Sequence, residues 1–284
     1  MSPVLRHLLT VSLLAALTLP PLTAVSSTSA DRGSANRIVE STSCSTQTHT
    51  IEHHSVASGL DPRHIQVLDW NLQKADHPAF EADLASLSAG ADLLVFQEAR
   101  LQAEAINALS AYPYAVFAPG YTTTSQTTGV LTLSQTQPLF HCSLSHLEPW
   151  LRSPKATSVS YFAIEQSTRS LLVINLHGVN FTLGSVDFKE QLAASSRLIA
   201  AHSGPVIFAG DFNTWNAARK TALNDLASEL ELEAVAFADD QRVRVLGYAM
   251  DHILVRDLQV LASQVHPVQS SDHNALSVTL AVKS

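Results

Sequence analysis

The chain has 284 residues, 46% of them hydrophobic and 15% charged, with a formal net charge of -8 at pH 7. That apolar content is ample for one large domain or two small ones, and we expect one. The acidic balance disfavours a protein that coats nucleic acid through many phosphate contacts, because such binding depends on clustered cations. It leaves room for an enzyme that binds a single phosphate group through local cations or a metal ion.

The first 30 residues have the pattern of a secretory signal peptide. Arg6 precedes an apolar stretch from Leu8 to Leu19, which is followed by two prolines and then by small residues. A transmembrane helix needs roughly 20 apolar residues, so this stretch is short for a membrane anchor, although an uncleaved anchor is the alternative. No second candidate span follows. We therefore expect a secreted or periplasmic protein without a transmembrane segment in its mature form.

Residues 31–62 are rich in serine, threonine and other polar residues without periodicity, which is typical of a linker. We therefore expect the folded domain to occupy residues 63–284. The two cysteines, Cys44 and Cys142, allow one internal disulfide, which would fit an exported protein. A buried Cys142 thiol with Cys44 loose in the linker is equally consistent with the sequence.

Strand-like apolar runs alternate with amphipathic segments beyond residue 63. The apolar runs predict strands at 65–68, 93–96, 129–133, 159–164, 171–176 and 206–209. Amphipathic patterns predict helices at about 78–88, 101–110, 188–202 and 217–230. Three of the strands follow one another with little helix between them, so hairpins mix with crossovers. The pattern predicts a mixed α/β sheet protein rather than a simple doubly wound one.

Short polar clusters follow the apolar runs where the predicted strands end. They contain Asn71, Gln97-Glu98, Asn175 with His177, Asp211 with Asn213, Asp251-His252 and Ser271-Asp272-His273. Strand ends are where a sheet scaffold usually carries its chemistry, because side chains from distant segments can converge there. Carboxylates, amides and histidines in such a set predict a hydrolytic metal site.

These clusters, in this order, resemble the motifs of the endonuclease/exonuclease/phosphatase superfamily. The resemblance includes Trp70-Asn71 and Asn175-Leu176-His177, and it covers about Arg63 to Ser284. Residues 155–272 particularly resemble an uncharacterised bacterial branch. The resemblance implies a DNase I-like four-layer sandwich of the α+β or α/β class, in which helices flank two packed mixed β-sheets. It also implies hydrolysis of phosphoester bonds with Mg²⁺ as cofactor, with Mn²⁺ or Ca²⁺ as alternatives.

The resemblance also implies roles for individual residues. Glu98 is expected to be the principal metal ligand, assisted by Asn71 and Asp272, since a hard cation prefers oxygen donors. His273 resembles the catalytic histidine of the family, and Asp251 resembles the partner that orients it. The resemblance implies that Asp211 orients or activates the attacking water. Two further residues are expected to donate hydrogen bonds to the phosphoryl oxygens, namely Asn213 and His177.

Several neighbouring residues have more ordinary interpretations. His252 follows Asp251 directly, so in an extended strand its side chain points to the opposite face, and we expect it to be structural. Lys155 could contact a substrate phosphate or remain solvated. Gln73 stands two positions after Asn71, where DNA-repair members carry an acidic residue, so metal coordination there is expected to be weaker.

Three functions are consistent with the sequence. The favoured one is an exported Mg²⁺-dependent nuclease that cleaves phosphodiester bonds in DNA or RNA. The alternatives are a phosphodiesterase or phosphatase acting on phospholipids or small phosphate esters, and an inactive binding module. The binding module is disfavoured, since an appropriate side chain occupies every family position that can be mapped. We expect a monomer.

Overall fold

The structure is a computed structural model that describes residues 37–40, 42–44, 58–100, 111–149, 151–180, 182 and 184–283. The expected signal peptide and the expected helix at 101–110 lie outside these residues. The described residues all belong to one unit, Ser34–Ser284. No helix among them is long and apolar enough to span a membrane.

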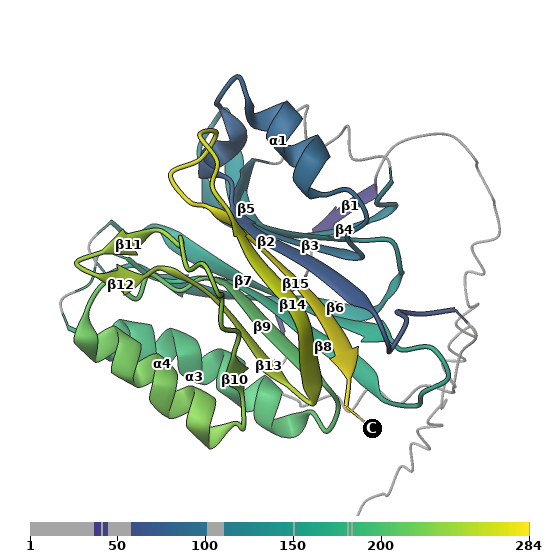
Figure 1. Cartoon of the computed structure of the whole chain (residues 1–284). Coiled ribbons are helices and arrows are strands. Elements are labelled where there is room, and N and C mark those ends of the chain that lie inside the picture. Colours follow the sequence, from purple (N-terminus) through teal and green to yellow (C-terminus); the bar gives the residue numbers. More distant parts are fainter. Residues whose placement is uncertain are drawn as a thin grey trace, which may run out of the picture. The chain divides into compact units, whose positions relative to one another are not determined.

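Two mixed sheets form the centre of the fold (Figure 1). The seven strands of the first sheet are, in spatial order, β1 (Arg37–Glu40), β4 (Tyr114–Thr122), β5 (Thr127–Ser134), β3 (Leu93–Arg100), β2 (Ile65–Asn71), β15 (Ala275–Val282) and β14 (Leu258–His266). The six strands of the second are β10 (Glu233–Ala234), β13 (Asp251–Arg256), β9 (Val206–Asp211), β8 (Ser170–His177), β7 (Pro154–Ala163) and β6 (Pro138–Leu147). A small hairpin, β11 (Arg244–Val245) and β12 (Tyr248–Ala249), stands apart from both.

Helices cover the outer faces of the two sheets. The first sheet is covered by α1 (Phe80–Leu87), and the second by α3 (Val186–Ala201) and α4 (Ala217–Glu229) (Figure 1). A short turn, η1 (Gln73–Ala75), connects β2 to the segment that leads into α1. The helices expected at 78–88, 188–202 and 217–230 are therefore present with small shifts at their ends. The result is the four-layer DNase I-like sandwich that the resemblance implied.

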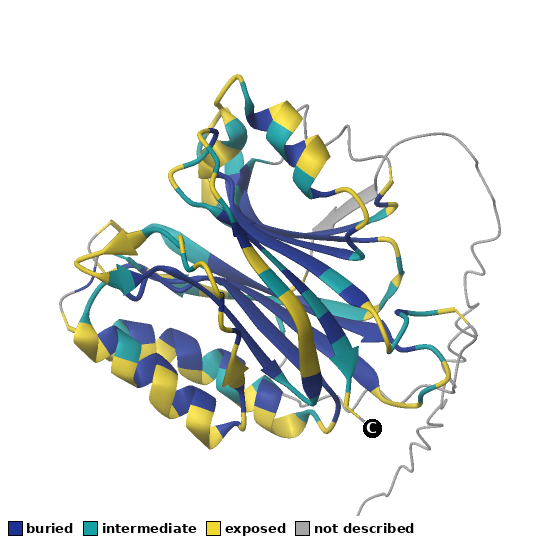
Figure 2. Ribbon diagram, viewed as in Figure 1, coloured by how far each residue is buried: buried dark blue, intermediate teal, exposed yellow. Residues whose placement is uncertain are grey.

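Side chains on the two faces of each central strand pack into two different apolar cores. In β2, Ile65 and Val67 enter the core between the sheets, whereas Leu68 and Trp70 pack toward α1. The other central strands alternate in the same way, and their buried residues form the dark layers of Figure 2. A strand buried on both faces reads as a continuous apolar run, and period two then fixes which face each residue occupies. The inward-facing series of β2 ends in Asn71.

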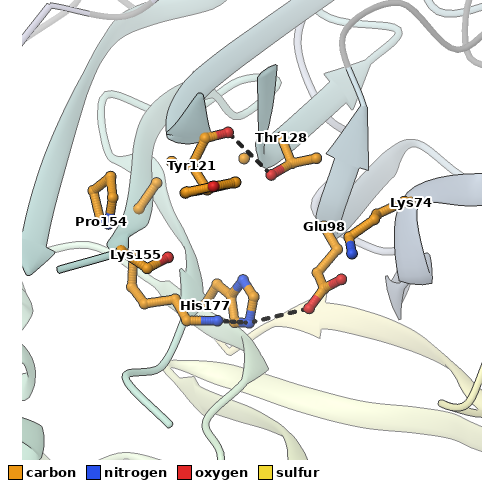
Figure 3. A pocket seen from close by; sticks show the side chains of 11 residues that line it. Lys74, Glu98, Tyr121, Thr128, Pro154, Lys155 and His177 are labelled. Atoms are coloured by element: carbon orange, nitrogen blue, oxygen red, sulfur yellow. Dashed lines mark hydrogen bonds and ion pairs between the residues drawn. The ribbon is translucent and has the colours of Figure 1, made fainter. Parts of the chain in front are cut away.

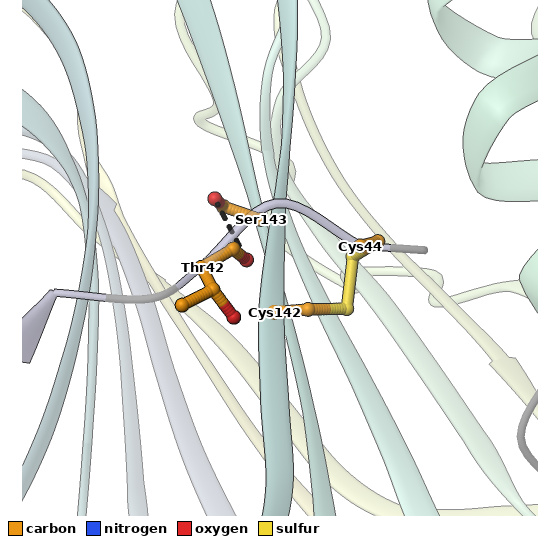
Figure 4. The surroundings of a disulfide bond; sticks show 4 residues. All are labelled: Thr42, Cys44, Cys142 and Ser143. Atoms are coloured by element: carbon orange, nitrogen blue, oxygen red, sulfur yellow. Dashed lines mark hydrogen bonds between the residues drawn. A yellow bond between two sulfur atoms is a disulfide. The ribbon is translucent and has the colours of Figure 1, made fainter. Parts of the chain in front are cut away.

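Residues 37–40 and 42–44 are attached to the edges of the two sheets. Strand β1 pairs in parallel with β4, and Ser43 forms an isolated bridge with Ser143 of β6. A disulfide joins Cys44 to Cys142, whose Cα atoms lie 4.8 Å apart (Figure 4). This answers the pairing question that the sequence left open. Part of the segment expected as a linker thus belongs to the sheet framework, and we call residues 37–44 the N-terminal strap.

Candidate active site

Neighbouring strands carry polar side chains to one end of the space between the sheets. His177 ends β8, Asp211 ends β9 and Asp251 begins β13, and the strand register pairs His177 with Asp211 and Asp211 with Asp251. The first sheet contributes Asn71, which ends β2, and Gln97 of β3, which is paired with it. All five are buried. They occupy the inward-facing positions of their strands, so the alternation that builds the core also assembles the site.

His273, in the loop before β15, is oriented by Asp251. Its Nδ1 lies 2.9 Å from each carboxylate oxygen of Asp251, and its Nε2 lies 4.0 Å from Oδ2 of Asp211. Burial alone would lower the pKa of His273, but the charge and hydrogen bond of Asp251, together with the charge of Asp211, raise it to about 10. His273 is therefore an imidazolium at neutral pH that donates its Nδ1–H to Asp251.

Asp211 is fixed by three hydrogen bonds. Its Oδ2 accepts from the side-chain amides of Asn71 at 3.1 Å and Asn213 at 3.2 Å, and its Oδ1 accepts from the backbone N–H of Asn213 at 2.9 Å. Burial raises the pKa of Asp211 to about 6, with His273 opposing the rise and Asp251 adding to it. Asp211 is thus an oriented carboxylate whose proton affinity lies close to neutral pH.

His177 is neutral and is bonded to Lys155. The ammonium of Lys155 lies 2.8 Å from Nε2 of His177, and because an ammonium can only donate, Nε2 accepts this hydrogen bond. Burial, followed by the charges of Lys155 and His273, lowers the pKa of His177 well below its usual value. The same Nε2 lies 3.7 Å from Oδ2 of Asp211. Lys155, which the sequence left undecided, therefore lies inside the site.

Glu98 reaches the site through an irregularity in β3. Gln97 already points inward, so strict alternation would turn Glu98 toward the helix side of the sheet. The register between β3 and β5 shifts between Phe96 and Ala99, and Glu98 has a φ of 50°. Such a left-handed residue costs roughly 1–2 kcal/mol, and a bulge re-aims its side chain. The Glu98 carboxylate thereby lies 3.8 Å from Nε2 of His177 (Figure 3).

The three expected metal ligands occupy different surroundings. Asn71 is buried beside Asp211, and the side chain of Glu98 is 29% exposed beside His177. Asp272 is exposed, its backbone N–H donates to Oε1 of Gln73 at 3.2 Å, and its charge adds to the rise in the His273 pKa. The structure therefore places Asp272 at the margin of the site.

A second set of possible ligand atoms comes from Asp211, Asp251 and His273, which lie within 4.8 Å of one another. Nδ1 of His273 already lies within hydrogen-bond distance of both carboxylate oxygens of Asp251, at 2.9 Å. We therefore assign Asp251 and His273 to an ion pair. Among the described residues, Glu98 and Asn71 also offer oxygen donors to a hard cation in this region.

A buried polar layer supports the site from below. Gln97 donates from Nε2 to Oδ1 of Asp69 and to Oδ1 of Asn175, each at 2.9 Å. Asn175 in turn donates across to Phe96 and Leu131 of the first sheet. Because Gln97 belongs to one sheet and Asn175 to the other, these bonds fix the separation of the sheets directly beneath the site. Burial raises the pKa of Asp69 well above its usual value, with the charge of Asp251 adding to the effect.

Two buried side chains outside the expected set hold the surrounding loops. Arg219 on α4 is fully buried, and its guanidinium donates to the backbone oxygens of Val179, Asn180 and Asn213. His252 faces away from Asp251, as expected, and its Nε2 lies 2.7 Å from Oγ1 of Thr214. The sequence showed Arg219 only as an arginine near the start of a predicted helix. Amphipathic periodicity does not distinguish a buried arginine at such a position from a solvated one.

The fold and the arrangement of this site define a class of protein. Residues 57–273 match the model of the Endonuclease/Exonuclease/phosphatase family, and the chain belongs to that family. The family consists of phosphodiesterase- and nuclease-type hydrolases that generally depend on a divalent metal.

A UPF0294 protein of Klebsiella pneumoniae (strain 342) is 39% identical over 215 residues, which cover 75% of this chain and 81% of that protein. An endonuclease/exonuclease/phosphatase from Beutenbergia cavernae DSM 12333 is similar with a TM-score of 0.63 at 15% identity, over 78% of this chain and 72% of that one. The human Nocturnin catalytic domain, solved with a bound sulfate anion, has a TM-score of 0.57 at 16% identity, over 80% and 97% of the two chains. At these identities the two structures establish the fold alone.

Proposed function

We propose that this protein is an exported, Mg²⁺-dependent phosphodiesterase whose substrate is a nucleic acid. The observation that carries the proposal is the convergence of Asp211, the Asp251–His273 ion pair and the Lys155–His177 pair at one end of the two sheets. This arrangement offers one proton acceptor and two cationic donors around a common centre, which suits attack by water on an anionic phosphorus. Export is supported by the signal-peptide pattern and by the disulfide.

The donor chemistry of the site suits a hard divalent cation. We propose that Glu98 and Asn71 hold it, with Asp272 contributing from the margin, because these groups offer oxygen atoms and Glu98 is partly exposed. Mg²⁺ bound there supplies charge neutralisation on the phosphoryl oxygens. Mn²⁺ and Ca²⁺ take similar oxygen ligands and are the alternatives.

Two residues of the chain carry out the proton transfers, one as acceptor and one as donor. Asp211, with a pKa of about 6, accepts the proton of the attacking water, and Asn71 and Asn213 fix the orientation of its carboxylate. His273 supplies a proton at Nε2 for the oxygen that leaves, since Asp251 keeps the imidazole charged.

Hydrogen bonds to the phosphoryl oxygens come from Lys155 rather than from the residues expected at first. Both amide protons of Asn213 are engaged, one with the backbone oxygen of Gly178 at 3.0 Å and one with Asp211. Nε2 of His177 already accepts from Lys155. We therefore propose that Asn213 and His177 position Asp211 and Lys155, and that the Lys155 ammonium contacts the substrate.

The experiment that tests the proposal is nicking of supercoiled plasmid by the mature protein with Mg²⁺. We expect nicking that is lost in EDTA and in the His273→Ala protein, whereas His64→Ala, which alters an exposed histidine, is expected to behave as wild type. Nicking that persists in EDTA would contradict metal dependence. Nicking that is unaffected by His273→Ala would contradict the proposed site.

One observation favours a phospholipid substrate as the second candidate. Val245 at the end of β11 and Leu246 in the turn that follows are 42% and 77% exposed, beside the segment that leads to Asp251. Exposed apolar loops at the margin of a site are what a lipid surface would require. Release of headgroup phosphate from phospholipid vesicles, with plasmid left intact under the same conditions, would support this candidate against the nuclease.

A further inference from the structure

A cavity of about 180 Å³ opens beside the catalytic centre and plays no part in the proton chemistry described above. Its walls come from both sheets, since Lys74 follows β2, Tyr121 lies on β4 and Lys155 lies on β7. Glu98 and His177 form the wall that it shares with the catalytic centre (Figure 3). A cavity of this size is smaller than the roughly 300 Å³ at which pockets for whole ligands begin. It therefore has room for one part of a substrate whose phosphorus lies at the centre.

Tyr121 is placed at this cavity by an irregularity in β4. The register between β4 and β5 shifts between Pro119 and Thr122, and this is the point at which Tyr121 occurs. Tyr121 is 52% exposed, whereas residues 115–118 earlier in the strand are buried, and Figure 3 shows its ring at the open space of the cavity. A β-bulge at the margin of a site commonly re-aims a side chain. An exposed aromatic ring in this position offers a flat face to a ligand.

The backbone that carries Lys74 is strained. Gln73, Lys74 and Ala75 have φ values of 45°, 66° and 60°, so three consecutive residues other than glycine lie in the left-handed region. L-residues usually adopt this region singly, and strain of this kind gathers at functional sites. The turn is held in place because the side chain of Gln73 accepts from Asp272 and its backbone N–H donates to Asn71. Its effect is to bring the Lys74 ammonium to the wall of the cavity.

The charge of the cavity contrasts with that of the whole chain. Lys74 and Lys155 contribute two positive charges to its walls and Glu98 contributes one negative charge, while the chain has a formal net charge of -8. Lys155 is anchored by its bond to His177, so its ammonium already has a fixed position. Two lysines on opposite walls favour an anionic group, and the aromatic ring above them favours a planar one.

We propose that this cavity binds one nucleotide of a single-stranded nucleic acid, next to the phosphodiester that is cleaved. Its phosphate lies beside Lys74, while Lys155 stays on the phosphoryl group that is cleaved, and its base stacks on Tyr121. Cations together with an aromatic ring are the combination that binds single strands. A base held in a duplex is already stacked and paired, so it would have to leave the duplex before it could stack on Tyr121. The proposal rests on the phosphodiesterase function above and narrows its substrate class.

The test compares three substrates with the full mature protein and Mg²⁺. They are a labelled single-stranded oligonucleotide, the duplex of the same sequence, and bis(para-nitrophenyl) phosphate, a small diester that reports the chemistry alone. We expect the single strand to be cleaved with the higher kcat/KM of the two nucleic acids. Tyr121→Ala is expected to lower kcat/KM for the single strand about tenfold relative to the small diester, chiefly through KM, and Tyr121→Phe is expected to retain it.

A second variant tests the cationic wall. Lys74→Met is expected to weaken the dependence of log KM on log salt concentration for the single strand by about 0.7, the value for one phosphate contact on a single strand. Lys189→Met, which removes an exposed lysine on α3, is the matched control and is expected to leave the slope unchanged. Tyr121 and Lys74 are both exposed, so neither variant should impair folding.

Other outcomes separate the two proposals. Cleavage of the small diester together with equal rates on single strand and duplex, and no effect of Tyr121→Ala, would overturn the nucleotide subsite while leaving the phosphodiesterase. Cleavage of phospholipid and the small diester but of neither nucleic acid would also overturn it. Failure to cleave any diester with Mg²⁺ or Mn²⁺ would refute the proposed function, and the subsite proposal would fall with it.

Discussion

Asp251 controls the charge of the residue on which the proposed chemistry most depends. Its carboxylate holds Nδ1 of His273 at 2.9 Å and, against the effect of burial, raises the pKa of that imidazole to about 10. In Asp251→Asn we expect this pKa to fall toward the usual value of about 6.5, because an amide offers a hydrogen bond without the charge. Loss of a correctly charged proton donor should lower kcat/KM about a hundredfold or more.

The measurement is an NMR titration of His273 beside the kinetics of bis(para-nitrophenyl) phosphate cleavage. Asp257→Asn is the matched control, since Asp257 is half-exposed and pairs with Arg169 away from the site. An unchanged His273 pKa in Asp251→Asn would show that burial and other charges set it.

His252 makes stability depend on pH. Burial, with the charges of Lys220 and Arg242 adding to it, lowers the pKa of His252 to about 3. The unfolded chain binds a proton at this residue below about pH 6.5 while the folded chain does not. The contribution of His252 is therefore complete above pH 6.5 and is lost as the pH falls toward 3, at up to about 1.4 kcal/mol per pH unit.

Urea unfolding at pH 7 and pH 5 measures this effect. We expect His252→Gln to lose about 2 kcal/mol less stability between these pH values than the wild type. Glutamine keeps an N–H donor for the backbone oxygen of Ala249, which lies 3.2 Å from Nε2 of His252. His64→Gln, at an exposed position, is expected to retain the full pH dependence. Identical losses in His252→Gln and wild type would assign the acid sensitivity to other buried groups.

At the scale of the elements, the close approach of β8 and β9 depends on Gly210. A Cβ atom at this position would lie 2.1 Å from the backbone oxygen of Leu176, and Gly210 has a φ of 136°. Gly210→Ala must push the two strands apart where they present His177 and Asp211, and we expect it to cost about 3 kcal/mol of unfolding free energy. Gly184→Ala, where φ is 75° but no atom lies within 4 Å, should cost only about 1 kcal/mol.

Denaturant unfolding of the two glycine variants checks this difference. Equal losses would mean that backbone conformation, and not the approach of the strands, limits Gly210.

The way the strands are built and paired explains which site residues could be predicted from the sequence alone. Asp211 and His177 end strands that are buried on both faces, so an apolar run with a polar end was sufficient to predict their positions. The expectation that Asp251 also follows an apolar run was wrong, because Asp251 begins β13, which runs antiparallel to β9. The polar cluster after the run at 93–96 indicated Glu98 as a site residue, but its role as metal ligand came from the resemblance, because the bulge that re-aims its side chain leaves no mark in the periodicity. Lys155 was left undecided because its contact with His177 depends on how β7 and β8 are paired, and register is a tertiary property. Lys74 and Tyr121 stayed hidden for the same reason.

At the scale of the whole molecule, the disulfide closes a large part of the chain into a loop. Cys44 and Cys142 are 98 residues apart, and a loop of about 100 residues contributes up to about 4.7 kcal/mol in the chain-entropy model. We expect replacement of both cysteines by serine to lower the Tm by several degrees, with kcat at low temperature retained because neither cysteine lines the site. Thermal scans of the oxidised protein, the reduced protein and the double variant measure this. A Tm that is unchanged in the double variant would mean that the N-terminal strap is held by its backbone pairing alone.

The N-terminal strap also determines which strand edges face the solvent. Without β1, the outer edge of β4 would present unpaired backbone groups, and an open edge of this kind is a template for pairing with a second chain. The bond from Cys44 to β6 of the opposite sheet helps to keep β1 in place. We therefore expect oxidation of this one pair of cysteines to reduce edge-to-edge aggregation, and to do so only in a compartment where a disulfide can form.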